Sequence, residues 1–294
     1  MTGSPVWQTW LFICAAAFAV VLTFLLKPDL TTQVLLLAPF VAVFGLPHGA
    51  LDLSIAKVLW PLRGWRGKIK FASLYLSLSA LVVIFWILFP GASLFAFLIY
   101  SAVHFSGDWS DSPSALRWCG GAATIGGPAL FHQDDVAHIF GYLAPESAAN
   151  LATDCLAIAG GTALVIFVAM LILQPETRTR ASAEQAAIWL AAGLLAPLVY
   201  FIVYFCVLHS VRHTVATIQS LKDRKDALLT AGFLSAITAL MAVSSILFLD
   251  SFNPGLIAES ISQTVFIGLA SLTIPHMILV DRFQRRSHHL AKGL

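Results

Sequence analysis

Five histidines fall in or beside long apolar segments of the chain, where an ionisable ring is costly to bury. They are His48, His104, His209, His213 and His276. Ionisable side chains at membrane depth usually serve binding, transport or catalysis. Because neutral imidazoles are good ligands for transition metals, a shared metal site would account for the whole set. For each histidine taken alone, a hydrogen-bonded core position remains the alternative interpretation.

Two of these histidines, His209 and His213, stand four positions apart. On a helix this spacing places both rings on one face, where they can reach a single metal ion. The same spacing also occurs in pairs that serve packing alone, so the pattern is not specific by itself. Arg212 lies between them and points to another helix face, and we interpret it as a cation that reaches out to the membrane surface.

Two carboxylates follow histidines at the same helical spacing. Asp52 comes four residues after His48, and Asp108 comes four residues after His104. A carboxylate that accepts the ring N–H of a metal-bound histidine fixes its tautomer and raises its basicity. The spacing leaves open which imidazole each carboxylate contacts. Nitrogen ligands without thiolates suit zinc, copper or iron, and histidines with one or two open coordination positions suit an Fe(II) that binds O2.

The composition indicates an integral membrane protein. The 294 residues are 59% hydrophobic and 11% charged, with a mean hydropathy of +0.85. Soluble domains carry about 25% charged residues. At roughly 20 residues per span, the apolar segments allow about seven to nine transmembrane helices. We therefore predict an all-α, polytopic transmembrane helical bundle that forms a single integral membrane domain over residues 1–294, with the metal site in its core.

Interruptions of the apolar segments and the basic residues between them further define the expected topology. The segment Leu30–Trp60 is too long for one straight span, and Gly45–Pro47 interrupts it, so we expect a broken helix near His48. A further span is expected over Ala186–Val207. Basic residues cluster in three places that the positive-inside rule assigns to the cytoplasm, the C-terminus among them. They are Arg63, Arg66, Lys68 and Lys70, then Lys222, Arg224 and Lys225, then Arg282, Arg285 and Arg286.

Other features narrow the functional classes. There is no long basic stretch with interleaved aromatic residues, so nucleic-acid binding is not supported. The four cysteines are scattered singly, which indicates neither a disulfide framework nor a thiolate zinc site. His132 and His138 lie in a polar middle region where surface positions are expected. His288 and His289 lie in the basic tail.

The histidine motifs together resemble the Brp/Blh family of bacterial and archaeal β-carotene 15,15′-dioxygenases. The resemblance rests on Pro47–Asp52 (PHGALD), His104–Phe105 with Asp108–Trp109, His209–His213 (HSVRH) and Pro275–Met277 (PHM). The order and spacing of these motifs agree over nearly the whole chain. The PHGALD block is the most specific of them.

The resemblance implies a membrane-embedded enzyme that cleaves the central double bond of β-carotene with O2 and a non-haem Fe(2+), giving two retinal molecules. Carried over by position, the iron ligands would be His48, His104, His209 and His213. His276, Asp52 and Asp108 are candidates for a fifth ligand or for partners that hydrogen-bond to the ligands. No separate catalytic side chain beyond the metal centre is needed. The family also implies a functional link to a retinal-binding rhodopsin, and location in the cell inner (plasma) membrane.

An intramembrane pocket for β-carotene should be an apolar and aromatic tunnel, since the substrate dissolves in the bilayer. Tyr204, five residues before His209, is the best candidate for lining it. Two alternatives stay open. One is a different histidine-rich membrane metalloenzyme of the di-iron desaturase or hydroxylase type, although such enzymes use more histidine boxes. The other is a non-enzymatic transporter or haem-binding protein.

Overall fold

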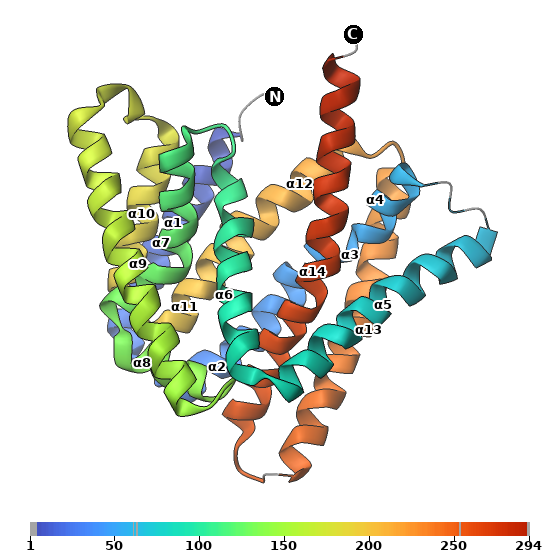
Figure 1. Cartoon of the computed structure of the whole chain (residues 1–294), viewed down its shortest axis with the longest axis horizontal. Coiled ribbons are helices and arrows are strands. Elements are labelled where there is room, and N and C mark those ends of the chain that lie inside the picture. Colours follow the sequence, from blue (N-terminus) through green and yellow to red (C-terminus); the bar gives the residue numbers. More distant parts are fainter. Residues whose placement is uncertain (1–4, 61, 63, 253, 293–294) are drawn as a thin grey trace. The chain divides into compact units, whose positions relative to one another are not determined.

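A computed structural model of the chain describes residues 5–60, 62, 64–252 and 254–292, with side chains described up to residue 283. Every regular element among these residues is a helix, which confirms the all-α prediction (Figure 1). The helices group into two compact units. The first unit holds residues 1–41 and 89–212, and the second holds residues 42–88 and 213–294. The assignment of residues 1–294 to a single membrane domain stays a prediction.

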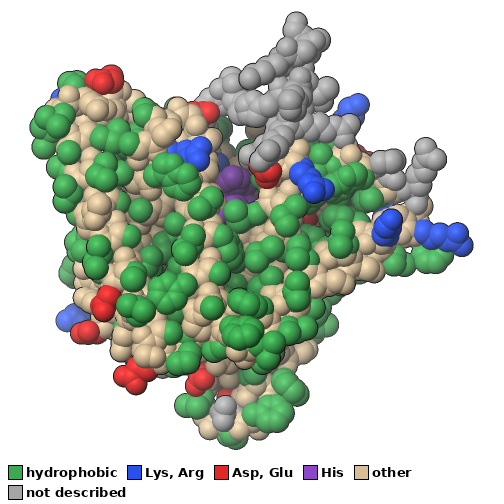
Figure 2. All heavy atoms as spheres, viewed as in Figure 1, with side chains coloured by type: hydrophobic (Ala, Val, Ile, Leu, Met, Phe, Trp, Pro, Cys, Tyr) green, Lys and Arg blue, Asp and Glu red, His purple; other side chains and the backbone are tan. Residues whose placement is uncertain are grey.

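Seven stretches of the described chain are long and apolar enough to cross a membrane, which falls within the predicted range. They are Val6–Leu26, Leu30–Leu59, Gly64–Leu88, Glu146–Leu173, Pro197–Ser220, Arg224–Phe252 and Ile257–Phe283. Hydrophobic side chains also cover much of the face that Figure 2 shows, with few charged groups among them. A surface of this kind is favourable in lipid rather than in water. These helices indicate a multi-pass membrane protein.

Among the residues that the structure describes, the first unit contains eight α-helices, joined by short 3-10 and π-helical segments. The helices are α1 (Val6–Leu26), α2 (Leu30–Phe40), α6 (Pro90–Ser106), α7 (Ser114–Phe131), α8 (Gln133–Gly141), α9 (Glu146–Leu173), α10 (Arg180–Leu194) and α11 (Pro197–Ile202). The short segments are the 3-10 turns η2 (Gly107–Trp109) and η3 (Pro175–Thr177) and the π-helix η4 (Val203–His209). Helix α7 packs against α6, α9 and α10.

The contact between α7 and α9 depends on two glycines that face each other. A Cβ at Gly160 would lie 2.6 Å from the Gly126 carbonyl oxygen, and a Cβ at Gly126 would lie 2.7 Å from the Leu156 carbonyl oxygen. Real side chains do not come this close, so the backbones approach here only because both positions lack a side chain. Small residues at helix crossings are a common way to pack helices within lipid.

Gly160→Ala is therefore expected to lower the free energy of unfolding of the purified protein by about 1–3 kcal/mol, the usual cost of overpacking. Gly161→Ala is the matched control, because a Cβ there meets only Leu130 Cδ1 at an ordinary 3.6 Å. Alanine has the higher helix propensity, so the control should be neutral or slightly stabilising. Thermal unfolding of both variants in detergent measures the difference. Equal melting temperatures would show that the close approach does not matter.

The predicted span over Ala186–Val207 is wrong in its bounds. Helix α10 ends at Leu194, Leu195 is extended with φ −102° and ψ 145°, and α11 begins at Pro197. The physical reason is Pro197, which cannot donate a backbone hydrogen bond and keeps the residue before it, Ala196 (φ −59°, ψ 145°), out of helical geometry. The helix that carries the two closely spaced histidines therefore starts at this proline and continues as η4 and α12 (Ser210–Ser220).

The second unit contains the broken helix near His48. The π-helix η1 (Val41–Gly45) leads into α3 (Leu46–Ala50), and a turn at Leu51 separates α3 from α4 (Asp52–Leu59). This confirms the predicted break. The remaining helices are α5 (Gly64–Leu88), α13 (Arg224–Phe252) and α14 (Ile257–Lys292). Helix α14 packs against α4, α5 and α13, and α3 packs against both α13 and α14.

Candidate metal centre

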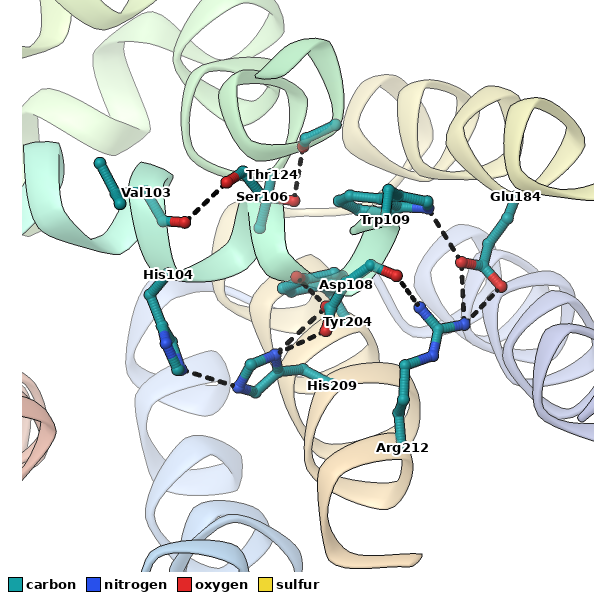
Figure 3. Close-up of polar contacts among 11 residues, drawn as sticks. Val103, His104, Ser106, Asp108, Trp109, Thr124, Glu184, Tyr204, His209 and Arg212 are labelled. Carbon is teal, nitrogen blue, oxygen red and sulfur yellow. Dashed lines mark hydrogen bonds and ion pairs between the residues drawn. The ribbon is translucent and has the colours of Figure 1, made fainter. Parts of the chain in front are cut away.

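In the first unit, two histidines from different helices point their ring nitrogens at each other (Figure 3). His104 lies in the last turn of α6 and His209 ends η4; their Nε2 atoms are 3.1 Å apart. Two nitrogens that bind one metal at about 2.1 Å and at right angles would lie about 3.0 Å apart. The spacing of the two rings therefore suits a pair of ligands to the same ion.

The other ring nitrogen of His209 faces a buried carboxylate. His209 Nδ1 lies 3.2 Å from both oxygens of Asp108, and both side chains are fully buried. The Tyr204 hydroxyl donates to Asp108 Oδ2 at 2.6 Å. An ionised carboxylate only accepts hydrogen bonds, so Nδ1 of His209 must carry the proton and Nε2 the lone pair. This is the usual arrangement for a metal-binding histidine.

Two short segments that are not α-helical position Asp108 and His209. The 3-10 turn η2 carries Asp108, and the π-helix η4 ends at His209. A π-helical turn is wider than an α-helical one and often occurs at functional sites. Around His209, the Phe105 ring lies edge-on with its centroid 4.8 Å away, and the Phe205 ring stacks at 5.7 Å. These contacts leave the imidazole little freedom to rotate.

A buried ion pair adjoins the first cluster, and it overturns the interpretation of Arg212 as an interfacial cation. Arg212 is 8% exposed, and its Nη2 donates to both oxygens of Glu184 in α10 at 2.8 and 2.9 Å. Glu184 also accepts from Trp109 Nε1 and Thr9 Oγ1. Arg212 Nη1 donates to the backbone carbonyl of Asp108 at 3.0 Å. The guanidinium therefore holds the turn that positions Asp108.

The second unit has its own cluster of histidines. The His48 ring centroid lies 4.6 Å from that of His276 in α14 and 5.6 Å from that of His213 in α12. His276 Nδ1 is 2.7 Å from Asp52 Oδ1, and the Tyr75 hydroxyl of α5 donates to Asp52 Oδ2 at 2.8 Å. The side chains of His276 and Asp52 are nearly inaccessible, at 6% and 5% exposure.

The donor groups of both clusters fit a transition-metal ion. They are imidazoles and carboxylates without thiolates, and in each cluster a carboxylate faces Nδ1 of one ring. Asp108 with His209, and His48 with His276, belong to groups whose donor atoms lie close enough together to hold a metal ion, and nitrogen-rich ligation of this kind includes iron among the suitable metals. The four-histidine ligand set inferred from the resemblance stays a prediction, as does His276 as a candidate fifth ligand.

The other residues for which the sequence predicted a position lie in different environments. Tyr204 is fully buried and supports Asp108 through its hydroxyl, and its role in lining a substrate tunnel stays a prediction. His138 is exposed, as expected for a surface position, whereas His132 is half-buried. The side chains of His288 and His289 lie outside the described part of the chain. Sequence reasoning missed Tyr75 and Glu184, because a single tyrosine in an apolar span and a single glutamate near the start of a helix carry no motif.

Comparison with known proteins decides among the functional alternatives. Residues 40–284 match the family described as β-carotene 15,15′-dioxygenase. The chain belongs to this family. It is also 33% identical, over 82% of its length and 90% of the relative's, to a β-carotene 15,15′-dioxygenase from an uncultured marine bacterium, 66A03. No solved structure matches the chain. Membership favours a carotenoid-cleaving dioxygenase over the di-iron, transporter and haem-binding alternatives.

Proposed function

We propose that this protein cleaves the central double bond of β-carotene inside the membrane and releases two retinal molecules. Family membership over most of the chain is the observation that carries the proposal. The reaction is balanced with O2 alone, because the double bond breaks and each of its two carbons gains one oxygen atom. Seven apolar stretches support a site within lipid, where a long polyene is already dissolved.

We further propose that the cofactor is Fe(2+), held by His48, His104, His209 and His213. When bound, iron would supply the activation of O2 that the side chains here cannot. The support is the chemistry of the two clusters: His104 and His209 face each other in the first unit, and His48 and His213 lie together in the second.

The chain's own residues hold and orient these ligands. The Asp108 carboxylate keeps the proton of His209 on Nδ1, and the Tyr204 hydroxyl fixes that carboxylate in turn. Complete burial of His209 keeps water from its ring. Exclusion of water strengthens the electrostatic interactions in such a site and limits side reactions of reactive oxygen species.

The location and orientation of the protein in the cell are proposed from its sequence. The protein would lie in the inner (plasma) membrane, and the basic residues beside its apolar stretches support a C-terminus in the cytoplasm. Retinal released into that membrane would be available to a retinal-binding rhodopsin. The substrates would be β-carotene and O2.

Product analysis tests the proposal. Purified, iron-loaded protein supplied with β-carotene in detergent under O2 is expected to give two retinal molecules for each β-carotene consumed. Chromatography against authentic retinal measures the ratio. Apocarotenals of unequal length would place the cleavage elsewhere, and the absence of any apocarotenal from iron-loaded protein would overturn the function. Incubation without O2 is the control, since no product should form.

A further inference from the structure

The two clusters are built in the same order from unrelated helices. In the first unit a tyrosine hydroxyl donates to an aspartate, the aspartate accepts from a histidine Nδ1, and that histidine faces a second histidine: Tyr204, Asp108, His209, His104. The second unit repeats the chain with Tyr75, Asp52, His276 and His48. The position that His209 holds in the first cluster is held by His276 in the second.

The geometry of the two histidine pairs also agrees. The ring centroids of His104 and His209 are 4.8 Å apart with an interplanar angle of 70°, and those of His48 and His276 are 4.6 Å apart at 71°. The Nδ1–carboxylate distance is 3.2 Å for His209 and 2.7 Å for His276. Each pair therefore presents two rings edge to face, with the carboxylate on the same nitrogen.

We propose that His276 is itself a metal ligand, binding through Nε2 to the ion that His48 binds. This inference rests on the proposed iron site and deepens it. With the Nδ1 proton directed at Asp52, the lone pair of the neutral ring lies on Nε2. Asp52 and Tyr75 are then positioning residues for this ligand, as Asp108 and Tyr204 are for His209.

Burial favours a ligand over a simple hydrogen-bonded core residue. His48 and His276 are 9% and 5% exposed, and Asp52 is 3% exposed. A histidine–aspartate pair that served packing alone does not require a second imidazole beside it, and here one lies edge-on at 4.6 Å. Two neighbouring imidazoles with a buried carboxylate behind one of them are the arrangement that a bound cation stabilises, because the cation offsets the cost of burying the carboxylate charge.

Counting the imidazoles on iron tests this proposal without relying on activity. Fe(2+)-loaded protein is treated with nitric oxide, and pulsed electron paramagnetic resonance of the adduct counts the coordinated imidazole nitrogens. His276→Ala is expected to lose one coordinated imidazole relative to the unmodified protein. His138→Ala is the matched control, because His138 is exposed in α8 and its removal should leave the count unchanged.

The affinity for Fe(2+) gives a second measurement, made on another variant, which remains available if His276→Ala does not fold. Asp52→Asn keeps both rings, and it is expected to weaken Fe(2+) binding about 10–100-fold, the usual effect of removing the partner of a metal-bound histidine. In His276→Gly, added imidazole should restore part of the lost affinity.

The outcomes separate the two proposals. Unmodified protein without any imidazole-coupled iron would overturn the proposed iron site itself. Unmodified protein with coupled iron, together with an unchanged count in His276→Ala, would overturn only the assignment of His276. Unchanged Fe(2+) affinity in Asp52→Asn would count against it as well.

Discussion

His209→Ala is expected to lose iron and to lower the rate of retinal formation by more than about 100-fold. Even the hydrogen-bond partners of a metal-bound histidine are typically worth 10–100-fold in affinity or activity, and removal of the ligand should cost more. His209 is the most constrained histidine of the first unit, fully buried between Asp108 and His104. Iron content by elemental analysis and retinal formation by chromatography measure the two effects on the same preparation.

Two further variants make this experiment specific to the site. Asp108→Asn keeps the size of the side chain but removes the charge that holds the His209 proton, so a smaller loss of iron affinity, about 10–100-fold, is expected. His138→Ala removes an exposed histidine and should change neither measurement. Full iron content and full activity in His209→Ala would remove His209 from the ligand set.

The sequence alone indicated the histidines of the site, but it did not indicate which histidine each carboxylate contacts. Spacing placed Asp52 near His48 and Asp108 near His104 along a helix. In the structure Asp52 lies against His276, 224 residues away, and Asp108 against His209, 101 residues away. The turn at Leu51 and the 3-10 turn η2 interrupt regular α-helical geometry between each histidine and the acid that follows it. Helical periodicity does not extend across such breaks.

The prediction from hydropathy agrees with the structure in the number of long apolar helices. It differs in the bounds of one span, where a proline interrupts the helix. Long apolar segments predicted the number of spans because lipid requires each backbone to satisfy its own hydrogen bonds. The span predicted over Ala186–Val207 failed at Pro197, which hydropathy does not register. The division of the helices into two units depends on packing between segments far apart in the chain, which single-sequence patterns do not encode.

Arg212 shows how a residue beside the ligands can serve the site and the fold at once. It links Glu184 of α10 to the backbone carbonyl of Asp108, so the position of the turn η2 depends on a charge pair. The sequence indicated an interfacial position for Arg212 and gave no sign of its buried partner Glu184. An arginine and a glutamate 28 residues apart carry no pattern that distinguishes a buried pair from two surface charges.

Glu184→Gln is accordingly expected to destabilise the protein by about 3–5 kcal/mol, because it leaves the guanidinium of Arg212 buried without its counter-charge. Thermal or denaturant unfolding in detergent measures this loss. Asp226→Asn is the matched control: Asp226 pairs with Lys57 at 2.7 Å, but its side chain is 57% exposed, and such pairs are worth about 0–1 kcal/mol. Similar losses in the two variants would show that burial does not strengthen the Arg212 pair.

The double variant Glu184→Gln/Arg212→Gln separates the charge pair from the packing around it. Its loss of stability should be smaller than the sum of the two single losses, because the second substitution removes the charge that the first one left uncompensated. Fe(2+) affinity should nevertheless fall in the double variant, since the hydrogen bond from Arg212 to the Asp108 carbonyl is also gone. Recovered stability with weakened iron binding would therefore assign to Arg212 the positioning of Asp108, and unchanged iron binding would limit Arg212 to a structural role.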